Sequence, residues 1–346
     1  MVVPSSTGFV CALVCGLLAA TPATAARRAA AEPPAYSVVV PTAALPRAKR
    51  LYYVAPSGSD ANLGTKRAPW RTIQRAVNAL GPGKAAVVRA GTYTERVVAP
   101  VGGRFTARAT LIAYPGERPV LAGRLKITAR YFRVSGFDFR SNGTEEAIVW
   151  VSARNVEVSM NEIHAGTTSC VFGGGDRVRI VSNWIHDCGT HHVNGLPQDH
   201  GIYWTGGNDS LIANNVIERA IGFGIQVHPY TSSNARNVIR DNTVLANGRL
   251  TGGSLGASGI ILDGSATAFT VVKNNVLAWN STNGVRSFGT VGPGNVVSGN
   301  LGWQNPQGDF PTGPAGGGLS YRLNTVAPPF TSSARRFGSR LVRPTP

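Results

Sequence analysis

The stretch Val178-Arg179-Ile180-Val181-Ser182-Asn183 joins a run of β-branched residues to an asparagine, and this pattern recurs along the chain. The other copies are Phe132-Arg133-Val134-Ser135-Gly136, Val156-Glu157-Val158-Ser159-Met160-Asn161, Leu211-Ile212-Ala213-Asn214-Asn215, Val238-Ile239-Arg240-Asp241-Asn242, Val271-Val272-Lys273-Asn274-Asn275 and Val296-Val297-Ser298-Gly299-Asn300. Their last residues, at positions 136, 161, 183, 215, 242, 275 and 300, are 22 to 33 residues apart. Self-similarity at such a period indicates a repeat protein.

Each repeat contains a second apolar segment, which most often follows a glycine. These segments are Ile148-Val149-Trp150, Cys170-Val171-Phe172, Ile202-Tyr203-Trp204, Ile225-Gln226-Val227, Ile260-Ile261-Leu262 and Val285-Arg286-Ser287. A coil of this size cannot bury its own apolar face, whereas coils stacked in parallel share one continuous core. An antiparallel sandwich would not repeat two strands in phase. We therefore predict an all-β fold, a right-handed parallel β-helix, with asparagines stacked in a hydrogen-bonded ladder at equivalent turns.

Composition divides the chain into four segments. Residues 1–25 lack charge and combine an apolar run, 9–20, with small residues at 23–25, which predicts a signal peptide and a secreted, extracellular protein. Residues 26–50 are rich in Ala, Pro and Arg and are expected to form a disordered leader. The β-helix domain is predicted over 51–330, followed by a flexible tail at 331–346. We find no segment apolar enough to span a membrane.

Charge and cysteines narrow the choice of partners and compartment. The formal net charge is +17, which attracts anionic partners. For an exported protein, acidic polysaccharide fits this charge better than nucleic acid does, and we expect a monomer. Cys170 and Cys188 remain once the predicted signal is removed. An even pair in an exported protein predicts a disulfide, and two buried thiols are the alternative.

The start of the β-helix segment carries a recognisable pattern. It comprises Leu51-Tyr52-Tyr53-Val54-Ala55-Pro56-Ser57-Gly58-Ser59-Asp60, Pro69-Trp70-Arg71-Thr72-Ile73-Gln74-Arg75-Ala76-Val77 and Arg89-Ala90-Gly91-Thr92-Tyr93. The chain, over about residues 51–305, resembles secreted right-handed β-helix proteins of the pectate-lyase-like superfamily, which includes polysaccharide lyases and epimerases. Apolar spacing predicts a short amphipathic helix over 70–80. The resemblance implies that this helix caps the N-terminal end of the solenoid.

The same resemblance does not identify a reaction, because this fold hosts lyases, hydrolases, epimerases and non-catalytic adhesins. The chain has no paired-Asp motif of the polygalacturonase type. It also lacks the Asp-Pro-His-Asp string of alginate epimerases, and the nearest match is Pro197-Gln198-Asp199-His200.

Strand alternation predicts which side chains leave the core. The residue after each glycine, such as Ile202, should point inward, and the next residue should point outward. The candidate catalytic residues on the resulting face are His200, His228, Tyr203 and Arg286. The candidate substrate-binding residues are Gln226, Asp263, Asp199, Trp204 and Phe288, with the aromatic ones as stacking surfaces. Insertions at 188–198 and 247–257 flank this face.

These residue types suit β-elimination on a uronate. The reaction needs a cation beside the carboxylate, for which Arg286 is the candidate. It needs a base for the C5 proton, here His228 or His200, and an acid for the leaving oxygen, here Tyr203. C5 epimerisation needs the same groups. Structural roles remain open for each, such as turn formation by Asp263.

Other functions and ligands stay as alternatives. A glycoside hydrolase needs two carboxyl groups about 5–9.5 Å apart, and few acids approach the predicted face. A non-catalytic carbohydrate-binding protein would use only the aromatic surfaces. The cluster His186, Asp187, His191, His192, Asp199 and His200 matches no recognised transition-metal spacing, so no metal is predicted. The resemblance leaves Ca²⁺, bound through Asp199 or Asp187, as the candidate cofactor.

Overall fold

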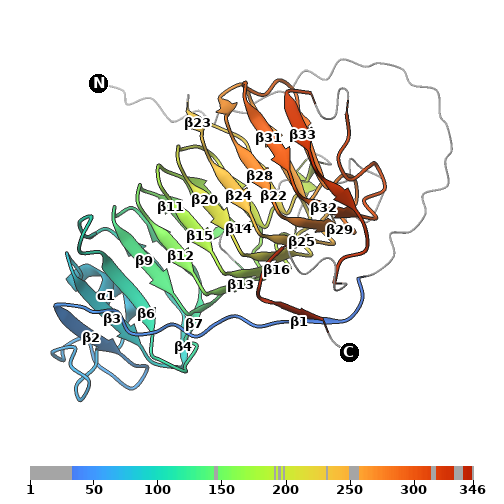
Figure 1. Cartoon of the computed structure of the whole chain (residues 1–346). Coiled ribbons are helices and arrows are strands. Elements are labelled where there is room, and N and C mark those ends of the chain that lie inside the picture. Colours follow the sequence, from blue (N-terminus) through green and yellow to red (C-terminus); the bar gives the residue numbers. More distant parts are fainter. Residues whose placement is uncertain are drawn as a thin grey trace, which may run out of the picture.

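A computed structural model describes residues 33–143, 147–190, 192–193, 196–197, 199–230, 233–248, 257–312, 317–330 and 338–344. Within these ranges the chain winds into stacked coils whose strands form three long parallel sheets (Figure 1). The predicted parallel β-helix is therefore confirmed. The predicted signal peptide, 1–25, lies outside the described residues.

Successive coils pass through the sheets in the same order, and the coils after β30 have strands in sheets 1 and 2 only. Sheet 1 contains β2 (Arg50–Val54), β3 (Lys84–Val88), β6 (Ala109–Ala113), β9 (Phe132–Ser135), β12 (Glu157–Ser159), β15 (Arg179–Val181), β20 (Leu211–Ala213), β24 (Val238–Arg240), β28 (Val271–Lys273), β31 (Asn295–Ser298) and β33 (Leu319–Arg322). Sheet 2 contains β4 (Thr92–Tyr93), β7 (Val120–Ala122), β10 (Asp138–Arg140), β13 (Glu162–His164), β16 (Trp184–His186), β21 (Val216–Glu218), β25 (Thr243–Leu245), β29 (Val276–Ala278), β32 (Leu301–Trp303) and β34 (Thr325–Val326).

Sheet 3 is the shortest of the three. It contains β5 (Arg96–Ala99), β8 (Arg124–Ile127), β11 (Ala147–Ser152), β14 (Ser169–Gly174), β19 (Ile202–Trp204), β22 (Ile225–Val227), β26 (Ile260–Asp263) and β30 (Val285–Phe288). Two-stranded pairs add β1 (Tyr36–Val38) with β35 (Val342–Pro344), β17 (His192–Val193) with β18 (Leu196–Pro197), and β23 (Asn234–Ala235) with β27 (Thr267–Ala268).

Alternation along these short strands builds the core. In sheet 3, Ile202, Ile225, Ile260 and Val285 pair in register, and all four are fully buried. Burying one such aliphatic side chain contributes about 1.5–3 kcal/mol. The same parity turns the intervening residues outward, and this fixes the composition of the exposed rows of sheet 3.

A ladder of buried asparagines runs along the turn between sheets 1 and 2. Asn183, Asn215, Asn242, Asn275 and Asn300 occupy the predicted anchor positions. The amide of Asn215 donates to Asn242 at 2.9 Å, and that of Asn242 donates to Asn275 at 2.9 Å. Each side chain also accepts from the backbone N–H of the preceding asparagine, as in the 3.0 Å bond from Asn215 N. The ladder therefore sets the register of successive coils.

The predicted helix is α1 (Ile73–Ala79), which lies at the N-terminal end of the stack beside β2 and β3 (Figure 1). The Thr72 side chain caps it by accepting from Arg75 N at 3.1 Å. Ile73, Ala76 and Val77 are fully buried. The short helix therefore covers the first coils, as the resemblance implies. In the described part of the chain no helix is long and apolar enough to span a bilayer.

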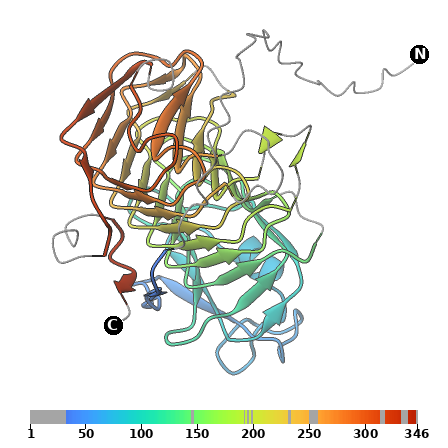
Figure 2. The same cartoon turned by 90° about the vertical axis from the view of Figure 1, so that its right-hand side faces the viewer.

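The described parts of the chain ends differ from the expected disordered leader and flexible tail. Tyr36–Val38 pairs antiparallel with Val342–Pro344, so the two ends lie side by side against the solenoid (Figure 2). Val39 N donates to Leu341 O at 2.9 Å. The leader also buries Ala43 against Val87 and Ile112 of sheet 1. Residues 26–32 and 331–337 lie outside the described ranges.

Candidate functional site

Two outward rows cross sheet 3. Register places Lys126, Trp150, Phe172, Tyr203, Gln226, Ile261 and Arg286 in the first row. Ile261 is only 2% exposed, because it packs against Phe223 and Ala257. Asp263 pairs with Phe288 in the second row, and His228 precedes Asp263 there by one coil. Alternation thus placed Tyr203, Gln226 and Arg286 correctly. Neighbouring members of a row are about 4.8 Å apart, so Tyr203 and Gln226 are adjacent, and Arg286 lies two coils beyond Gln226.

His228 and Asp263 form a hydrogen-bonded pair. His228 Nδ1 lies 2.6 Å from Asp263 Oδ2, and the imidazole is partly exposed. An ionised carboxylate only accepts hydrogen bonds, so in the neutral form of the imidazole Nδ1 carries the hydrogen and Nε2 has the lone pair. The structure therefore presents His228 as an oriented imidazole able to take a proton through Nε2.

Tyr203 faces this pair from the first row. Its hydroxyl lies 2.6 Å from that of Tyr230, and the ring centroids of Tyr203 and His228 are 6.4 Å apart. Burial, followed by the hydrogen bond to Tyr230, raises the pKa of Tyr203. The phenol therefore keeps its proton at neutral pH. Tyr230 is 63% exposed and was not among the residues predicted from sequence.

Arg286 supplies a cation one coil beyond Asp263. Its guanidinium carbon lies 5.6 Å from the ring centroid of Phe288. Burial lowers the pKa of Arg286 and the Asp263 carboxylate opposes this, yet a guanidinium stays charged at neutral pH. Its Nε is buried and has no hydrogen-bond partner among the described residues. A buried N–H of this kind can donate a hydrogen bond to a ligand oxygen.

Sequence reasoning missed an aromatic stripe in the first row. Trp150 and Phe172 meet edge to face with centroids 5.0 Å apart, and Phe172 meets Tyr203 in the same way at 5.5 Å. The ammonium of Lys126 lies 4.6 Å from the centroid of Trp150. Counting the same strand parity back from Tyr203 would have found both aromatics. The stripe extends the candidate site by two coils.

The structure contradicts the predicted surface position of three site residues. His200, Trp204 and Asp199 all lie inside the molecule rather than on the exposed face of sheet 3. His200 is 1% exposed, its Nδ1 accepts from Phe223 N at 3.0 Å, and burial lowers its pKa to about 3. Trp204 is 2% exposed because its parity is that of Val227 in the core. Asp199 is also buried, and it accepts from Thr190 N at 3.0 Å. A polysaccharide on the surface cannot reach these side chains.

The predicted disulfide and the candidate calcium ligands can both be located. Cys170 and Cys188 form the disulfide, and both are buried. No group of three or more His, Cys, Asp or Glu side chains in the described ranges is placed to hold a metal ion. Asp187 instead pairs with His186 and Arg219 on sheet 2. The arrangement around Asp187 and Asp199 does not fit calcium, and His191 lies outside the described residues.

Comparison with known families identifies the fold. The profile described as "Pel9A-like, right handed beta helix region" matches residues 52–310, most of the chain. The chain belongs to the Pel9A-like right-handed β-helix family. Membership in it confirms the predicted handedness and the resemblance to pectate-lyase-like proteins.

Solved structures agree with the family on fold. Pectate lyase Pel9A superposes with a TM-score of 0.68 at 17% identity, covering 81% of this chain and 77% of that one. A rhamnogalacturonan lyase gives 0.60 at 15% identity, covering 74% of each chain. An alginate lyase from a Paenibacillus strain gives 0.53 at 16% identity, covering 81% and 99%. At these identities the likeness shows the fold alone.

A curated relative is similar to this chain over a smaller part of its length. The uncharacterized protein YwoF of Bacillus subtilis is 35% identical over 79 residues, which are 23% of this chain and 17% of that protein. The match thus spans less than a fifth of the relative's length.

Proposed function

We propose that this chain is a polysaccharide lyase that cleaves an acidic, uronate-containing polysaccharide by β-elimination. The observation that carries the proposal is the His228–Asp263 pair, 2.6 Å apart, in the second outward row of sheet 3. Tyr203 and Arg286 lie in the adjacent row. These residues supply a base, an acid and a cation on one face of a fold shared with pectate, rhamnogalacturonan and alginate lyases.

The residues divide the reaction as follows. Arg286 binds the uronate carboxylate and stabilises the negative charge that develops when the C5 proton leaves. His228 Nε2 takes that proton, the C5 electron pair forms the C4–C5 double bond, and the bond from C4 to the glycosidic oxygen breaks. Tyr203 gives its proton to the departing oxygen and regains one from solvent. Asp263 stabilises the imidazolium during the step.

The aromatic stripe supports a polymeric substrate. Trp150 and Phe172 continue the row of Tyr203 along the solenoid axis. Exposed ring faces bind the apolar faces of sugars, and successive rings allow successive sugars to be held. Lys126 and Arg124 lie over Trp150, at 4.6 and 5.7 Å from its ring centroid, and favour carboxylated sugars there. The proposed polysaccharide therefore runs along sheet 3, across its strands.

We also propose that the protein is exported. The predicted signal peptide and the Cys170–Cys188 disulfide support this, because disulfides persist in oxidising compartments. An extracellular location would bring the enzyme to its polymer.

C5 epimerisation is the second candidate, since it begins with the same proton abstraction by His228. It differs in the second half, when a proton returns to the opposite face of C5 and no bond to the glycosidic oxygen breaks. Tyr203 and Tyr230, whose hydroxyls are 2.6 Å apart, offer that proton source.

The test is an assay of the chain from residue 26 on pectate, alginate, glycosaminoglycans and neutral glycans, with and without calcium. We expect ultraviolet absorbance of the unsaturated uronate product to rise with one acidic polymer. His228→Ala should lower kcat at least about 100-fold, because general base catalysis contributes that much. His164→Ala is the matched control, because His164 pairs with Asp138 at 3.0 Å on sheet 2, outside the proposed site.

The outcomes separate the candidates. Absorbance that depends on His228 and not on His164 supports the lyase. Inverted uronates without new chain ends support the epimerase. Reducing sugar without an unsaturated product would contradict both in favour of a hydrolase. Binding without turnover under all conditions would indicate a carbohydrate-binding protein.

A further inference from the structure

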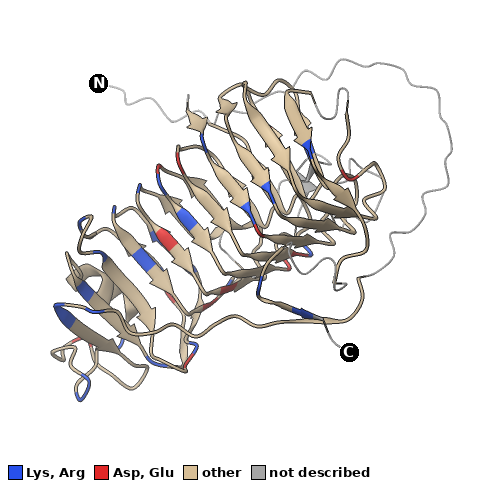
Figure 3. Ribbon diagram, in the orientation of Figure 1, with Lys and Arg blue, Asp and Glu red and all other residues tan. Residues whose placement is uncertain are grey.

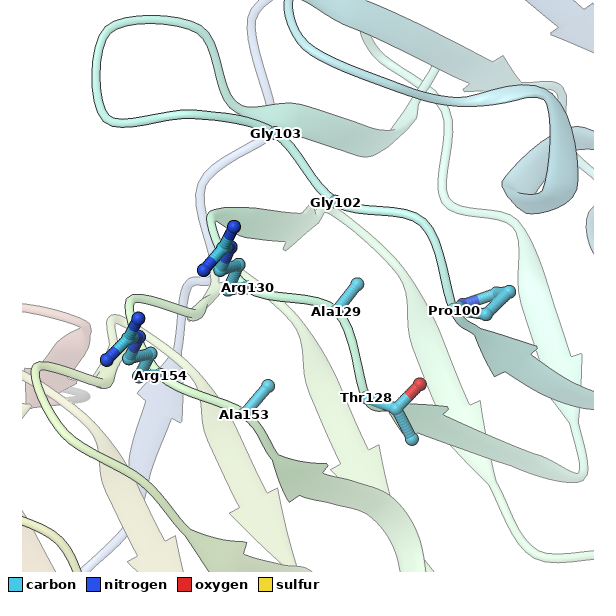
Figure 4. Close-up of a pocket in the computed structure, with 8 residues that line it drawn as sticks. All are labelled: Pro100, Gly102, Gly103, Thr128, Ala129, Arg130, Ala153 and Arg154. Atoms are coloured by element: carbon cyan, nitrogen blue, oxygen red, sulfur yellow. The ribbon is translucent and has the colours of Figure 1, made fainter.

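A pocket lies where the chain turns from sheet 3 into sheet 1 in three successive coils (Figure 4). Its lining residues are Pro100, Gly102 and Gly103 from the first turn, Thr128, Ala129 and Arg130 from the second, and Ala153 and Arg154 from the third. These turns follow β5, β8 and β11. The pocket is therefore separate from the rows that carry His228 and Asp263.

Small residues keep this pocket open. Ala129 and Ala153 project only a methyl group into it. At Gly102 an added Cβ would lie 2.0 Å from Arg130 O, and at Gly103 it would lie 2.3 Å from Ala107 O. The close approach of the turns therefore requires glycine at both positions. The pocket wall formed by the first turn consequently carries few side-chain atoms.

Arg130 and Arg154 occupy equivalent places in successive turns. Gly103 N donates to Arg130 O at 3.1 Å, and Tyr131 N donates to Arg154 O at 3.4 Å. Each arginine precedes a residue with positive φ, Tyr131 at 56° and Asn155 at 58°. The turn conformation thus repeats, and both guanidinium groups extend to the same side (Figure 4). Their backbones are about 4.8 Å apart, as in any pair of adjacent coils.

These two guanidinium groups have no acidic partner in the described part of the chain. Arg133 on β9 and Arg179 on β15 differ, because both pair with Glu157 on the strand between them, β12. Figure 3 shows basic residues recurring at turns along this edge. Like charges in adjacent coils repel each other. An anion bound between the two arginines would remove that repulsion.

We propose that Arg130 and Arg154 form a second binding site, which takes carboxylate groups of the acidic polysaccharide. Guanidinium groups bind carboxylates through paired hydrogen bonds. The turn after β11 lies three coils from β22, which precedes His228, or about 14 Å along the axis at about 4.8 Å per coil. One polysaccharide chain can therefore occupy both sites. The nature of this ligand rests on the proposed function.

The test measures binding separately from turnover. All variants carry His228→Ala, so that they bind without turnover. Their affinity for pectate and for alginate is measured by electrophoresis in gels that contain the polymer, and gels with dextran serve as the neutral control. We expect Arg130→Ala with Arg154→Ala to weaken binding to the preferred acidic polymer about tenfold, equivalent to about 1.4 kcal/mol. Arg130→Lys with Arg154→Lys should recover part of the affinity. The loss should shrink at high salt, which screens exposed charges.

Arg47→Ala with Arg67→Ala is the matched control, since both arginines are exposed and lie outside the pocket. It removes the same net charge and should change affinity by less than about twofold if binding is local. Equal losses in the two double variants would overturn the inference in favour of a general charge effect. Absence of binding to either acidic polymer in the parent would overturn it too. Product absorbance from the unmodified chain would still decide the lyase proposal.

Discussion

His186 holds a buried imidazole between two carboxylates on sheet 2. Its Nδ1 lies 2.7 Å from Asp187 and its Nε2 lies 3.3 Å from Glu162. Burial disfavours the charged ring, but the hydrogen bonds to Asp187 and Glu162 outweigh it and raise the pKa of His186 above 6.5. The folded chain then holds this proton more tightly than the unfolded chain does. The resulting stability is complete below pH 6.5 and is lost as pH rises through the folded pKa.

We therefore expect the free energy of unfolding in urea to stay constant below about pH 6.5, the reference pKa of histidine, and to fall as pH rises above it. His186→Gln should flatten this dependence. Asp187 does not contribute to this change, because its pKa is lowered and its carboxyl group therefore titrates only at acidic pH. His164→Gln, in the stacked neighbouring histidine, is the control. An unchanged pH dependence in His186→Gln would contradict the assignment.

Single residues also show where strand parity predicts a site and where it does not. Parity turned Tyr203, Gln226 and Arg286 outward because their strands pair without a bulge. The aromatic ring of Trp204 suggests a stacking surface, but the same parity directs it inward. His200 precedes its strand, at a turn covered by Phe223, so parity does not govern it. Burial of this kind comes from contacts across coils, which a single repeat does not encode.

The asparagine ladder is the element on which the coil register depends. Asn242 is fully buried, its amide donates to Ile212 O at 3.0 Å and to Asn275, and its oxygen accepts from Asn215. We expect Asn242→Ala to lower the free energy of unfolding by about 2–4 kcal/mol, since several buried polar groups lose their partner. Asn242→Asp should cost at least as much, because a carboxylate would face two acceptors.

Urea unfolding monitored by circular dichroism measures this change. Asn78→Ala is the control, because Asn78 is exposed on α1, and its expected effect is within about 0.5 kcal/mol. A loss at Asn242 no larger than at Asn78 would contradict a structural role for the ladder.

Periodicity predicted this ladder because its anchors recur in seven repeats, and the structure extends it to Asn324. A second ladder, Asn247, Asn280 and Asn305, went unpredicted. It spans only three coils, too few to stand out in an asparagine-rich chain. An element that recurs in many coils can therefore be predicted from the sequence, whereas one that recurs in a few coils cannot.

At the scale of the whole molecule, the pairing of the chain ends lies beyond what repetition predicts. β1 and β35 are separated by almost the entire sequence and belong to no coil. Composition near both ends favoured disorder, yet Tyr36 donates a hydrogen bond to the buried Glu218 and packs against Phe330. Contacts made once per molecule leave no period in the sequence.

The last segment therefore ought to stabilise the fold. Gly338 N donates to Asn274 O at 2.9 Å, Ser339 N donates to Thr243 Oγ1 at 2.8 Å, and Leu341 is 4% exposed. We expect a chain ending at residue 337 to lose these contacts and the β1 pairing. Its Tm, measured by calorimetry, should fall by about 5 °C or more, since about 1 kcal/mol corresponds to 2–4 °C in a domain of this size. A chain ending at residue 344 keeps β35 and should match the full chain. Equal Tm values for the chains ending at 337 and 344 would show that β35 adds nothing to stability.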